Sequence, residues 1–152
     1  MSPRAGADAG RWAERAAAAL SGKGRRRGGA REAVVELLDE QSCALSVSEI
    51  RRKLEERRRG VSRASAYRII DELEAVALLQ RVEVGAGPTR YEAIRPGGGH
   101  HHHLLCKSCG ALEPFTDAAL ERAIGRLSDR LAMRVFEHEI VIRGACRECL
   151  RR

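Results

Sequence analysis

The apolar positions in the first half of the chain repeat with the period of α-helices. From Ala30 onward, Val34, Leu37 and Leu38 fall on adjoining turns, which predicts a first helix with one buried face. The residues before it, 1–29, are rich in Ala, Gly and Arg. We expect a flexible basic tail there, in which Trp12–Leu20 can form a short helix and Lys23–Gly29 is a linker.

Two further helices are predicted by their capping residues. Ser46 with Glu49 three positions later has the pattern of a capping box, and we expect this helix to run to about Arg59 and to end at Gly60. Ser62 caps the third helix, over residues 63–78. Its expected buried stripe is Ala66, Ile69, Ile70, Leu73 and either Val76 or Ala77.

The period then changes to that of β-strands. Leu79–Val84 and Thr89–Ile94 flank a Gly-Ala-Gly-Pro turn, which predicts a hairpin. Three helices followed by a hairpin are the order of a winged helix-turn-helix domain. Arg95–Gly99 contains Pro and three glycines, and we interpret it as a hinge. The sequence thus predicts a DNA-binding domain over residues 30–94.

Beyond the hinge the pattern is that of a small α/β domain, residues 100–152. We expect an extended segment over His100–Leu105, a second strand over Leu112–Phe115 and a last strand over Arg134–Arg143. Between them lies a helix capped by Thr116 or Asp117, with Leu120, Ile124, Leu127 and Leu131 on its apolar face. The whole chain is therefore predicted to be an α+β protein.

Charge separates the two halves. Residues 1–68 carry 16 basic and 9 acidic side chains, whereas residues 69–152 carry 12 of each. An excess of positive charge confined to the first half favours a polyanionic partner for that half. The sequence has no apolar run long enough for a membrane span and no signal-peptide pattern. We therefore expect a cytoplasmic protein that does not enter a membrane.

Four of the five cysteines form two Cys-x-x-Cys pairs. Cys106 with Cys109, and Cys146 with Cys149, supply the four thiolates that structural zinc prefers. Four unrelated buried thiols, or a redox pair, are the alternatives. A four-sulfur site has no open coordination position, so we expect a structural Zn²⁺ rather than a catalytic one.

Four consecutive histidines, His100–His103, precede the first pair. If they lie in a strand, alternate side chains share a face, so that His101 and His103 point one way and His100 and His102 the other. One strand would then supply ligands to two metal sites. Glu92, Glu121 and His138 are candidates for the further ligands. The alternatives are a polar low-complexity tract and, for His138, a histidine satisfied within the core.

The chain resembles the Fur family of bacterial metal-dependent transcriptional regulators from about residue 30 to residue 150. The resemblance lies in the segment His100–Gly110, in Ser65–Arg68 at the start of the third helix, and in Gly144–Cys149. It implies a metal-responsive repressor that binds an inverted-repeat DNA operator as a homodimer. Zinc-sensing, Zur-like members are among those that it resembles.

The resemblance also implies roles for individual residues. Tyr67 and Arg68 match the pair of the DNA-reading helix, where Arg63 and Ser65 can share the contact. The implied regulatory site consists of Glu92, His101 and His103. The implied second metal site consists of His100, His102, Glu121 and His138. A second divalent metal, Zn²⁺ or Fe²⁺, would accompany the structural zinc.

Two positions depart from the family pattern. Many members have a histidine before the second helix, where this chain has Cys43 and Ala44, and many have a carboxylate where this chain has Pro114. Cys43 is either a further ligand, which would favour zinc, or a small buried side chain.

Two other functions are compatible with parts of the pattern. A zinc-dependent hydrolase or deaminase would need an open metal position, and the sequence lacks the His-x-Glu and Pro-Cys-x-x-Cys combination of a deaminase. A metal-buffering interaction module would leave the basic winged-helix half unexplained. We therefore expect a regulator and not an enzyme.

Overall fold

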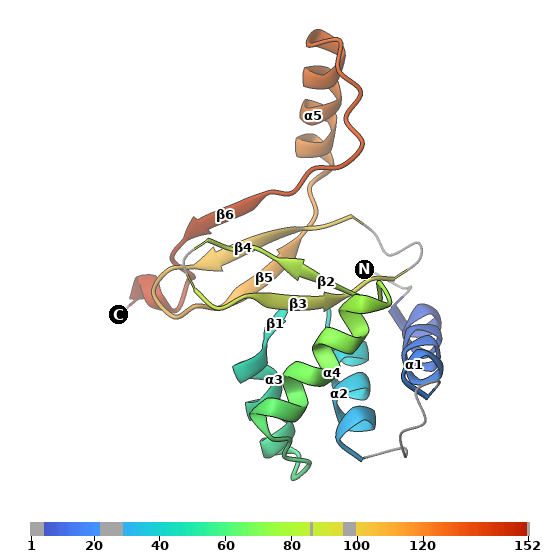
Figure 1. Ribbon diagram of the computed structural model, residues 1–152. Helices are drawn as coiled ribbons and strands as arrows, with labels where there is room; N and C mark the ends of the chain where they lie inside the picture. The colour runs from blue at the N-terminus through green and yellow to red at the C-terminus, as the bar shows by residue number, and fades with distance from the viewer. Residues whose placement is uncertain (1–4, 22–28, 86, 96–99, 152) are drawn as a thin grey trace. The chain divides into compact units, whose positions relative to one another are not determined.

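The chain divides into two units, residues 1–98 and 99–152, and each has a three-stranded sheet of its own (Figure 1). The computed structural model describes residues 5–21, 29–85, 87–95 and 100–151. Helices and strands occur in both units, which confirms the expected α+β class. None of the helices in this described part is long and apolar enough to cross a membrane.

The N-terminal unit combines a helical bundle with a small antiparallel sheet. The strand order is β1-β3-β2, and β2 and β3 form the predicted hairpin, with Gln80 opposite Glu92. Its elements are α1 (Ala5–Ser21), α2 (Gly29–Glu40), β1 (Leu45–Ser46), α3 (Val47–Glu56), α4 (Arg63–Ala75), β2 (Leu79–Val82) and β3 (Arg90–Ala93).

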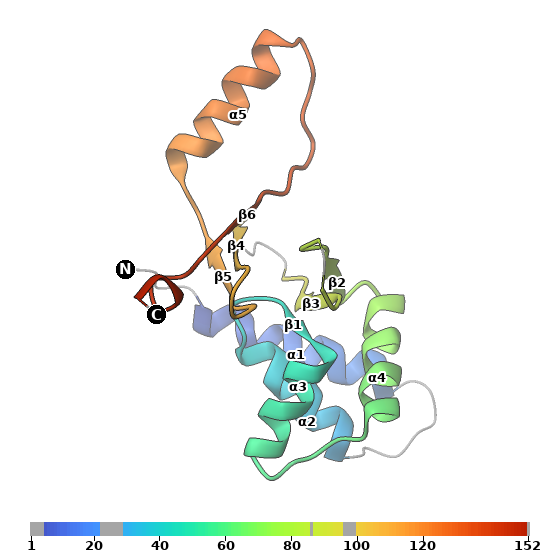
Figure 2. The same cartoon turned by 90° about the vertical axis from the view of Figure 1, so that its left-hand side faces the viewer.

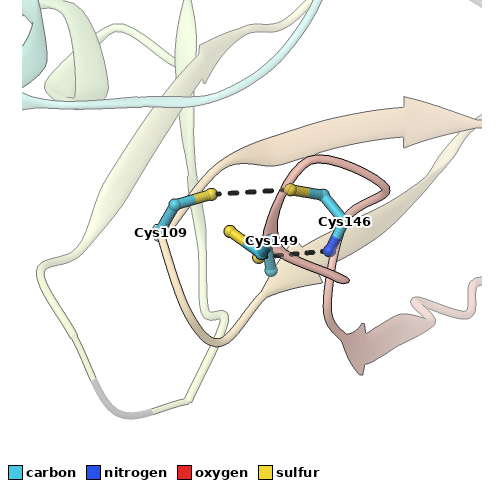
Figure 3. A group of neighbouring side chains, drawn as sticks. Cys109, Cys146 and Cys149 are labelled. Carbon is cyan, nitrogen blue, oxygen red and sulfur yellow. Dashed lines mark hydrogen bonds between the residues drawn. The ribbon is translucent and has the colours of Figure 1, made fainter. Parts of the chain in front are cut away.

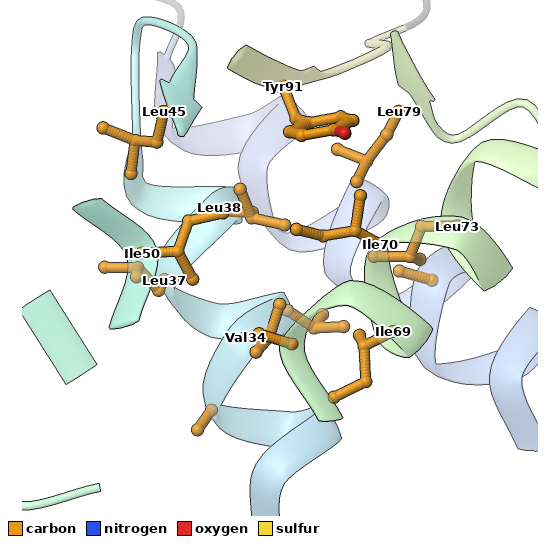
Figure 4. Close-up of a cluster of buried hydrophobic side chains, with 14 of the residues drawn as sticks. Val34, Leu37, Leu38, Leu45, Ile50, Ile69, Ile70, Leu73, Leu79 and Tyr91 are labelled. Atoms are coloured by element: carbon orange, nitrogen blue, oxygen red, sulfur yellow. The ribbon is translucent and has the colours of Figure 1, made fainter. Parts of the chain in front are cut away.

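Apolar side chains from all four helices and the sheet meet in one core. Figure 4 shows Val34 of α2, Ile50 of α3 and Ile70 of α4 pointing toward a shared interior. Each of these three side chains is fully buried. Tyr91 of β3 and Leu79 of β2 close the core on the sheet side. The helical periodicity of the sequence therefore identified the buried face of α2 and most of the buried face of α4.

The expectation of a flexible tail over residues 1–29 is wrong for α1. This helix is longer than the short helix expected there, and Trp12, Ala16 and Leu20 lie in the core. Their spacing of four residues places them on one helix face, so that α1 packs as a fourth helix of the unit. The indole Nε1 of Trp12 donates to the Leu78 carbonyl oxygen at 2.9 Å. The predicted linker falls outside the described residues, except for Gly29, which begins α2.

Helices α3 and α4 begin where their caps predict but end earlier than expected. The reciprocal bonds between Ser46 and Glu49 form the predicted capping box of α3. Helix α3 ends at Glu56, with Arg58 rather than Gly60 in the left-handed region (φ 56°). Similarly, Ala77 has a φ of 53° just beyond α4. This turn removes Val76 and Ala77 from the buried stripe, and both are exposed.

The C-terminal unit is built on a mixed sheet in the order β5-β4-β6. Strand β4 pairs antiparallel with β5 and parallel with β6. A parallel pair needs a crossover connection, which α5 and the segment after it provide; both project away from the sheet (Figure 2). The elements are β4 (His102–Cys106), β5 (Leu112–Phe115), α5 (Ala118–Arg130), β6 (Val141–Gly144) and a short 3₁₀ turn, Cys149–Arg151.

The last strand is much shorter than Arg134–Arg143, which the alternation of the sequence predicted. Only Val141–Gly144 pairs with β4, and residues 133–140 belong to no strand. The apolar alternation before Val141 therefore does not face the sheet of this chain. Phe136, in the middle of that alternation, is 85% exposed.

Candidate metal sites and DNA-binding helix

The four cysteines of the two Cys-x-x-Cys pairs lie together at one end of the C-terminal sheet. Their sulfur atoms are all within 4.8 Å of one another, and the Sγ atoms of Cys109 and Cys146 are 3.9 Å apart (Figure 3). Two thiolates on one tetrahedral zinc ion lie about 3.8 Å apart, given Zn–S bonds of about 2.3 Å. The donor set and its spacing therefore suit a structural Zn²⁺.

Local backbone geometry brings the two pairs together. Cys106 ends β4 opposite Gly144 of β6, so the parallel strands deliver both pairs to the same end of the sheet. After Cys106 the chain turns back through Gly110, whose φ of 75° is reached by glycine without strain. The Gly110 N–H closes this turn on the Cys106 carbonyl oxygen at 2.9 Å.

The electrostatics of the cluster differ from one thiol to the next. Backbone N–H groups of Cys109 and Cys146 donate to the Cys106 sulfur and lower its pKa to about 6. The pKa of Cys149 rises to about 12 because hydrogen bonds with the Cys146 and Cys109 sulfurs stabilise its protonated form. Cys106 therefore ionises more readily than Cys109 and Cys149, whose pKa values are raised. Those two thiols need a cation to ionise alongside it.

The histidine run shows the alternation that a strand imposes. The imidazole rings of His101 and His103 lie together, with centroids 4.9 Å apart, and those of His100 and His102 are 4.5 Å apart. Strand β4 itself begins only at His102. The two preceding residues nevertheless continue the alternation, so the run presents two pairs of rings.

His100 and His102 form a compact nitrogen and oxygen cluster with Glu121 and His138. The Nε2 atoms of His100 and His138 are 3.0 Å apart, and Glu121 lies 2.8 Å from His102 Nε2 and 3.1 Å from His138 Nε2. One possible donor atom from each of the four residues lies within 4.8 Å of the others. Glu121 comes from the first turn of α5, and His138 comes from the segment that returns toward β6. These residues fit a divalent metal ion.

The ionisation of this cluster also suits a cation. Hydrogen bonds from His102 and then His138 lower the pKa of Glu121. Burial and the neighbouring His138 and His102 lower the pKa of His100. A charged carboxylate beside neutral imidazoles is the protonation state that ligates metal.

Glu92, His101 and His103, the residues of the expected regulatory site, belong to different units. His103 is almost fully buried, and its Nδ1 lies 3.9 Å from an oxygen of Glu139. Glu92, on β3 of the N-terminal unit, is 7% exposed and accepts a hydrogen bond of 2.6 Å from Gln80. Within its own unit, Glu92 therefore has a hydrogen-bond partner in Gln80, and His103 has a charged neighbour in Glu139.

Cys43 lies half-buried in the N-terminal unit. Burial raises the pKa of its thiol to about 11. Like the raised thiols of the four-cysteine cluster, Cys43 would ionise only with a cation beside it.

Helix α4 presents a polar, aromatic face opposite its buried stripe. Ser62 caps the helix by accepting from the Ser65 N–H. Tyr67 is 39% exposed and does not belong to the buried core. The Arg63 guanidinium lies over this ring, 5.6 Å from its centroid, and Arg68 is exposed beside it. A tyrosine and two arginines therefore share one accessible surface.

Gln80 and Glu139 are two neighbours of the expected ligands that the pattern of the sequence did not single out. For Gln80 a signal exists, because hairpin pairing places residues equidistant from position 86 opposite each other, and these include Gln80 and Glu92. For Glu139 no such signal exists, because its segment does not form the strand that the alternation predicts.

Comparison with known proteins agrees with this architecture. The chain matches the Ferric uptake regulator family over residues 23–143. It is 29% identical over 117 residues to a ferric uptake regulation protein from Legionella pneumophila, covering 76% of this chain and 85% of that protein. It is 27% identical over 121 residues to the Bacillus subtilis protein of the same description, covering 78% of this chain and 81% of its relative.

Solved structures give the same result. The Helicobacter pylori ferric uptake regulator, described as having three functional metal binding sites, is 25% identical and has a TM-score of 0.76, with 93% of each chain covered. The Vibrio cholerae ferric uptake regulator has the same fold, with a TM-score of 0.69 at 23% identity, covering 85% of this chain and 98% of that one.

A helical N-terminal unit with an exposed polar helix, joined to a sheet unit rich in metal donors, defines a metal-responsive transcriptional regulator. The chain belongs to the Ferric uptake regulator family. Members of this family are regulators rather than enzymes, which supports regulation over the hydrolase, deaminase and metal-buffering alternatives. The donor sets provide for a structural zinc and for further divalent metal.

Proposed function

We propose that this protein is a cytoplasmic, metal-dependent repressor that binds an inverted-repeat operator as a homodimer. The observation that carries the proposal is the alternation of the histidine run, which pairs His101 with His103 and His100 with His102. One short segment thereby serves two nitrogen and oxygen donor sets beside the four-cysteine set. Three sets in one chain parallel the three functional sites described for the H. pylori protein.

Each donor set receives a different role. The four cysteines hold structural zinc, because a closed four-sulfur set has no open position. Glu92, His101 and His103 form the regulatory site, on the strength of the family resemblance and of the burial of Glu92 and His103. The second set (His100, His102, Glu121 and His138) adjusts the stability of the dimerisation domain, because it joins β4 to α5 and the segment that follows it.

The regulatory site couples metal to DNA through the two units of the chain. Glu92 comes from the N-terminal unit, whereas His101 and His103 come from the C-terminal unit. A bound Zn²⁺ or Fe²⁺ supplies coordination bonds that favour one arrangement of the two units. The population of DNA-binding dimers then rises with metal, because metal prefers that arrangement.

DNA is read by the exposed face of α4. In this proposal Tyr67 meets base edges and Arg68 meets phosphate, and Arg63 and Ser65 at the same helix start share the contact. A two-fold dimer presents two such helices, so the operator is an inverted repeat.

The test is selection of bound duplexes from a random DNA library, followed by affinity measurement with Zn²⁺, with Fe²⁺ and with chelator. We expect an inverted-repeat motif and affinity at least about tenfold higher with one of the metals. Tyr67→Ala should lose discrimination between operator and random DNA. Arg68→Ala should weaken binding to both and reduce the slope of log affinity against log salt concentration by about one. Equal binding with and without metal, or a motif lacking symmetry, would refute the proposal.

A further inference from the structure

The carboxylate of Glu92 is held in place by a neighbour on the adjacent strand. Gln80 of β2 lies directly opposite Glu92 of β3, and its Nε2 donates to Glu92 Oε1 at 2.6 Å. Gln80 is exposed, whereas Glu92 is 7% exposed. The amide therefore covers one oxygen of a buried acid from the solvent side of the hairpin.

This hydrogen bond restricts how the carboxylate can meet a cation. A carboxylate that ligates through both oxygens must turn its two oxygens toward the ion together. An N–H group bonded to Oε1 fixes the rotation of the group and directs lone-pair density of that oxygen toward the amide. Ligation through a single oxygen is then favoured.

On the side of β5, the residue paired with His103 adds no oxygen donor, because it is Pro114, which has no side-chain ligand atom. On the other side, an oxygen of Glu139 lies 3.9 Å from His103 Nδ1. Two imidazoles with one oxygen of Glu92 and at most one of Glu139 make three or four protein donors. Such a set suits four-coordinate zinc better than the oxygen-rich, six-coordinate environment that suits manganese.

We propose that Gln80 is a positioning residue that makes Glu92 a one-oxygen ligand and thereby biases the regulatory site toward zinc. The inference rests on the proposed function, which assigns Glu92 to that site. Gln80 itself does not contact the metal in this arrangement. Its effect is on the relative affinities for different ions, which a purely structural role would not change.

The experiment measures Zn²⁺ and Mn²⁺ affinities of the full chain, loaded with structural zinc, by competition with chelators. Gln80→Leu keeps the size of the side chain without the N–H, and Gln80→Thr is a second variant suited to a strand. We expect zinc affinity to fall about 10- to 100-fold, as for other residues that hold metal ligands, with manganese affinity within about threefold. Gln41→Leu, at the other glutamine of the chain, is the matched control and should match wild type.

Co²⁺ spectra give an independent readout, because four-coordinate Co²⁺ absorbs visible light far more strongly than six-coordinate Co²⁺. Subtracting the spectrum of Glu92→Ala isolates the regulatory ion. We expect an intense band for wild type and a weaker one for both Gln80 variants. An unchanged zinc-to-manganese ratio and an unchanged band in folded Gln80 variants would overturn the inference.

The same variants distinguish a failure of the inference about Gln80 from a failure of the proposed function. If Glu92→Ala retains the metal-binding capacity and affinities of wild type, Glu92 is not a ligand, and the site assignment itself is wrong. If Glu92→Ala loses one ion while the Gln80 variants behave as wild type, the site stands and only the role of Gln80 is refuted.

Discussion

Strand geometry decides which neighbours an individual side chain meets in this protein. The clearest case is the histidine run, in which neighbours in sequence belong to different ring pairs. We predict two phenotypes among alanine variants. His101→Ala, His103→Ala and Glu92→Ala should stay folded and keep structural zinc but lose metal-induced DNA binding.

Alanine variants of the second set (His100, His102, Glu121 and His138) should still respond to metal. Their metal threshold or dimer stability should shift instead. Metal titrations of DNA binding across all seven variants decide between these outcomes. If His100→Ala and His101→Ala behave alike while His101→Ala and His103→Ala differ, the two sets are assigned wrongly.

Glu49 shows how one carboxylate can link stability to pH. Burial alone would raise its pKa, but hydrogen bonds from Ser46 and the charge of Arg90 outweigh burial and lower the pKa below 4.5. Stability from this group is therefore present above pH 4.5 and is lost as the pH falls through the lowered pKa. Glu49→Gln keeps a capping side chain but not the charge. The substitution should lower the free energy of unfolding by about 1 kcal/mol at pH 7. It should also make that free energy less dependent on pH below about 4.5.

The fluorescence of Trp12, the only tryptophan of the chain, follows unfolding of the N-terminal unit as a function of pH. The informative quantity is the difference in unfolding free energy between wild type and Glu49→Gln. A difference that does not shrink as the pH falls below about 4.5 would contradict the assignment.

At the scale of elements, α1 is a structural part of the N-terminal unit. Trp12 packs in the core, donates to Leu78 and lies under the Arg95 guanidinium, which also bonds Asp39 at the end of α2. Trp12→Ala should lower the free energy of unfolding by about 3–5 kcal/mol, as for other buried tryptophans. Arg15→Ala, on the exposed face of the same helix, should change it by less than about 0.5 kcal/mol. Urea denaturation followed by circular dichroism measures both free energies of unfolding. If Trp12→Ala costs as little as Arg15→Ala, α1 does not support the core.

The four-cysteine set ties β4 to β6, the two strands that lie parallel. Cys106→Ser should release the tightly held zinc and a large part of the ~10–16 kcal/mol that such an ion contributes to folding. The zinc content of purified protein and thermal unfolding of the C-terminal unit report the loss. Cys43→Ser, in the other unit, should retain that zinc. Full zinc in the Cys106 variant would refute the assignment.

The sequence predicted most elements because their signals are local. Caps at Ser46, Ser62 and Asp117 mark helix starts, and these caps are present. The errors lie where tertiary contacts decide the outcome. Burial of Trp12 requires partners far along the chain, and the alternation before Val141 has no strand beside it.

Among the metal donors, the spacing of the cysteines and the alternation of the histidines indicated which residues converge in the C-terminal unit. The hydrogen bond from Gln80 to Glu92 depends on the register between strands β2 and β3.

At the scale of the whole molecule, the C-terminal unit leaves a stretch of apolar side chains exposed. Exposed fractions reach 59% for Leu131, 62% for Met133 and 85% for Phe136. Apolar side chains clustered in this way mark an interaction surface. In the proposed homodimer, the surface is covered by the second copy of the chain.

Phe136→Asp should therefore produce a monomer, because a charged carboxylate would have to be desolvated where the apolar surface meets the second copy. The four-cysteine set lies outside the substituted segment, so its zinc content per chain should not change. Operator affinity should fall about 100-fold or more, since a monomer engages a single half-site and loses the gain from linked binding. Sedimentation velocity and binding to whole and half operators measure both effects. Leu150→Asp, which is also exposed but lies outside that stretch, should remain dimeric. A dimeric Phe136→Asp variant with full operator affinity would place the dimer interface elsewhere.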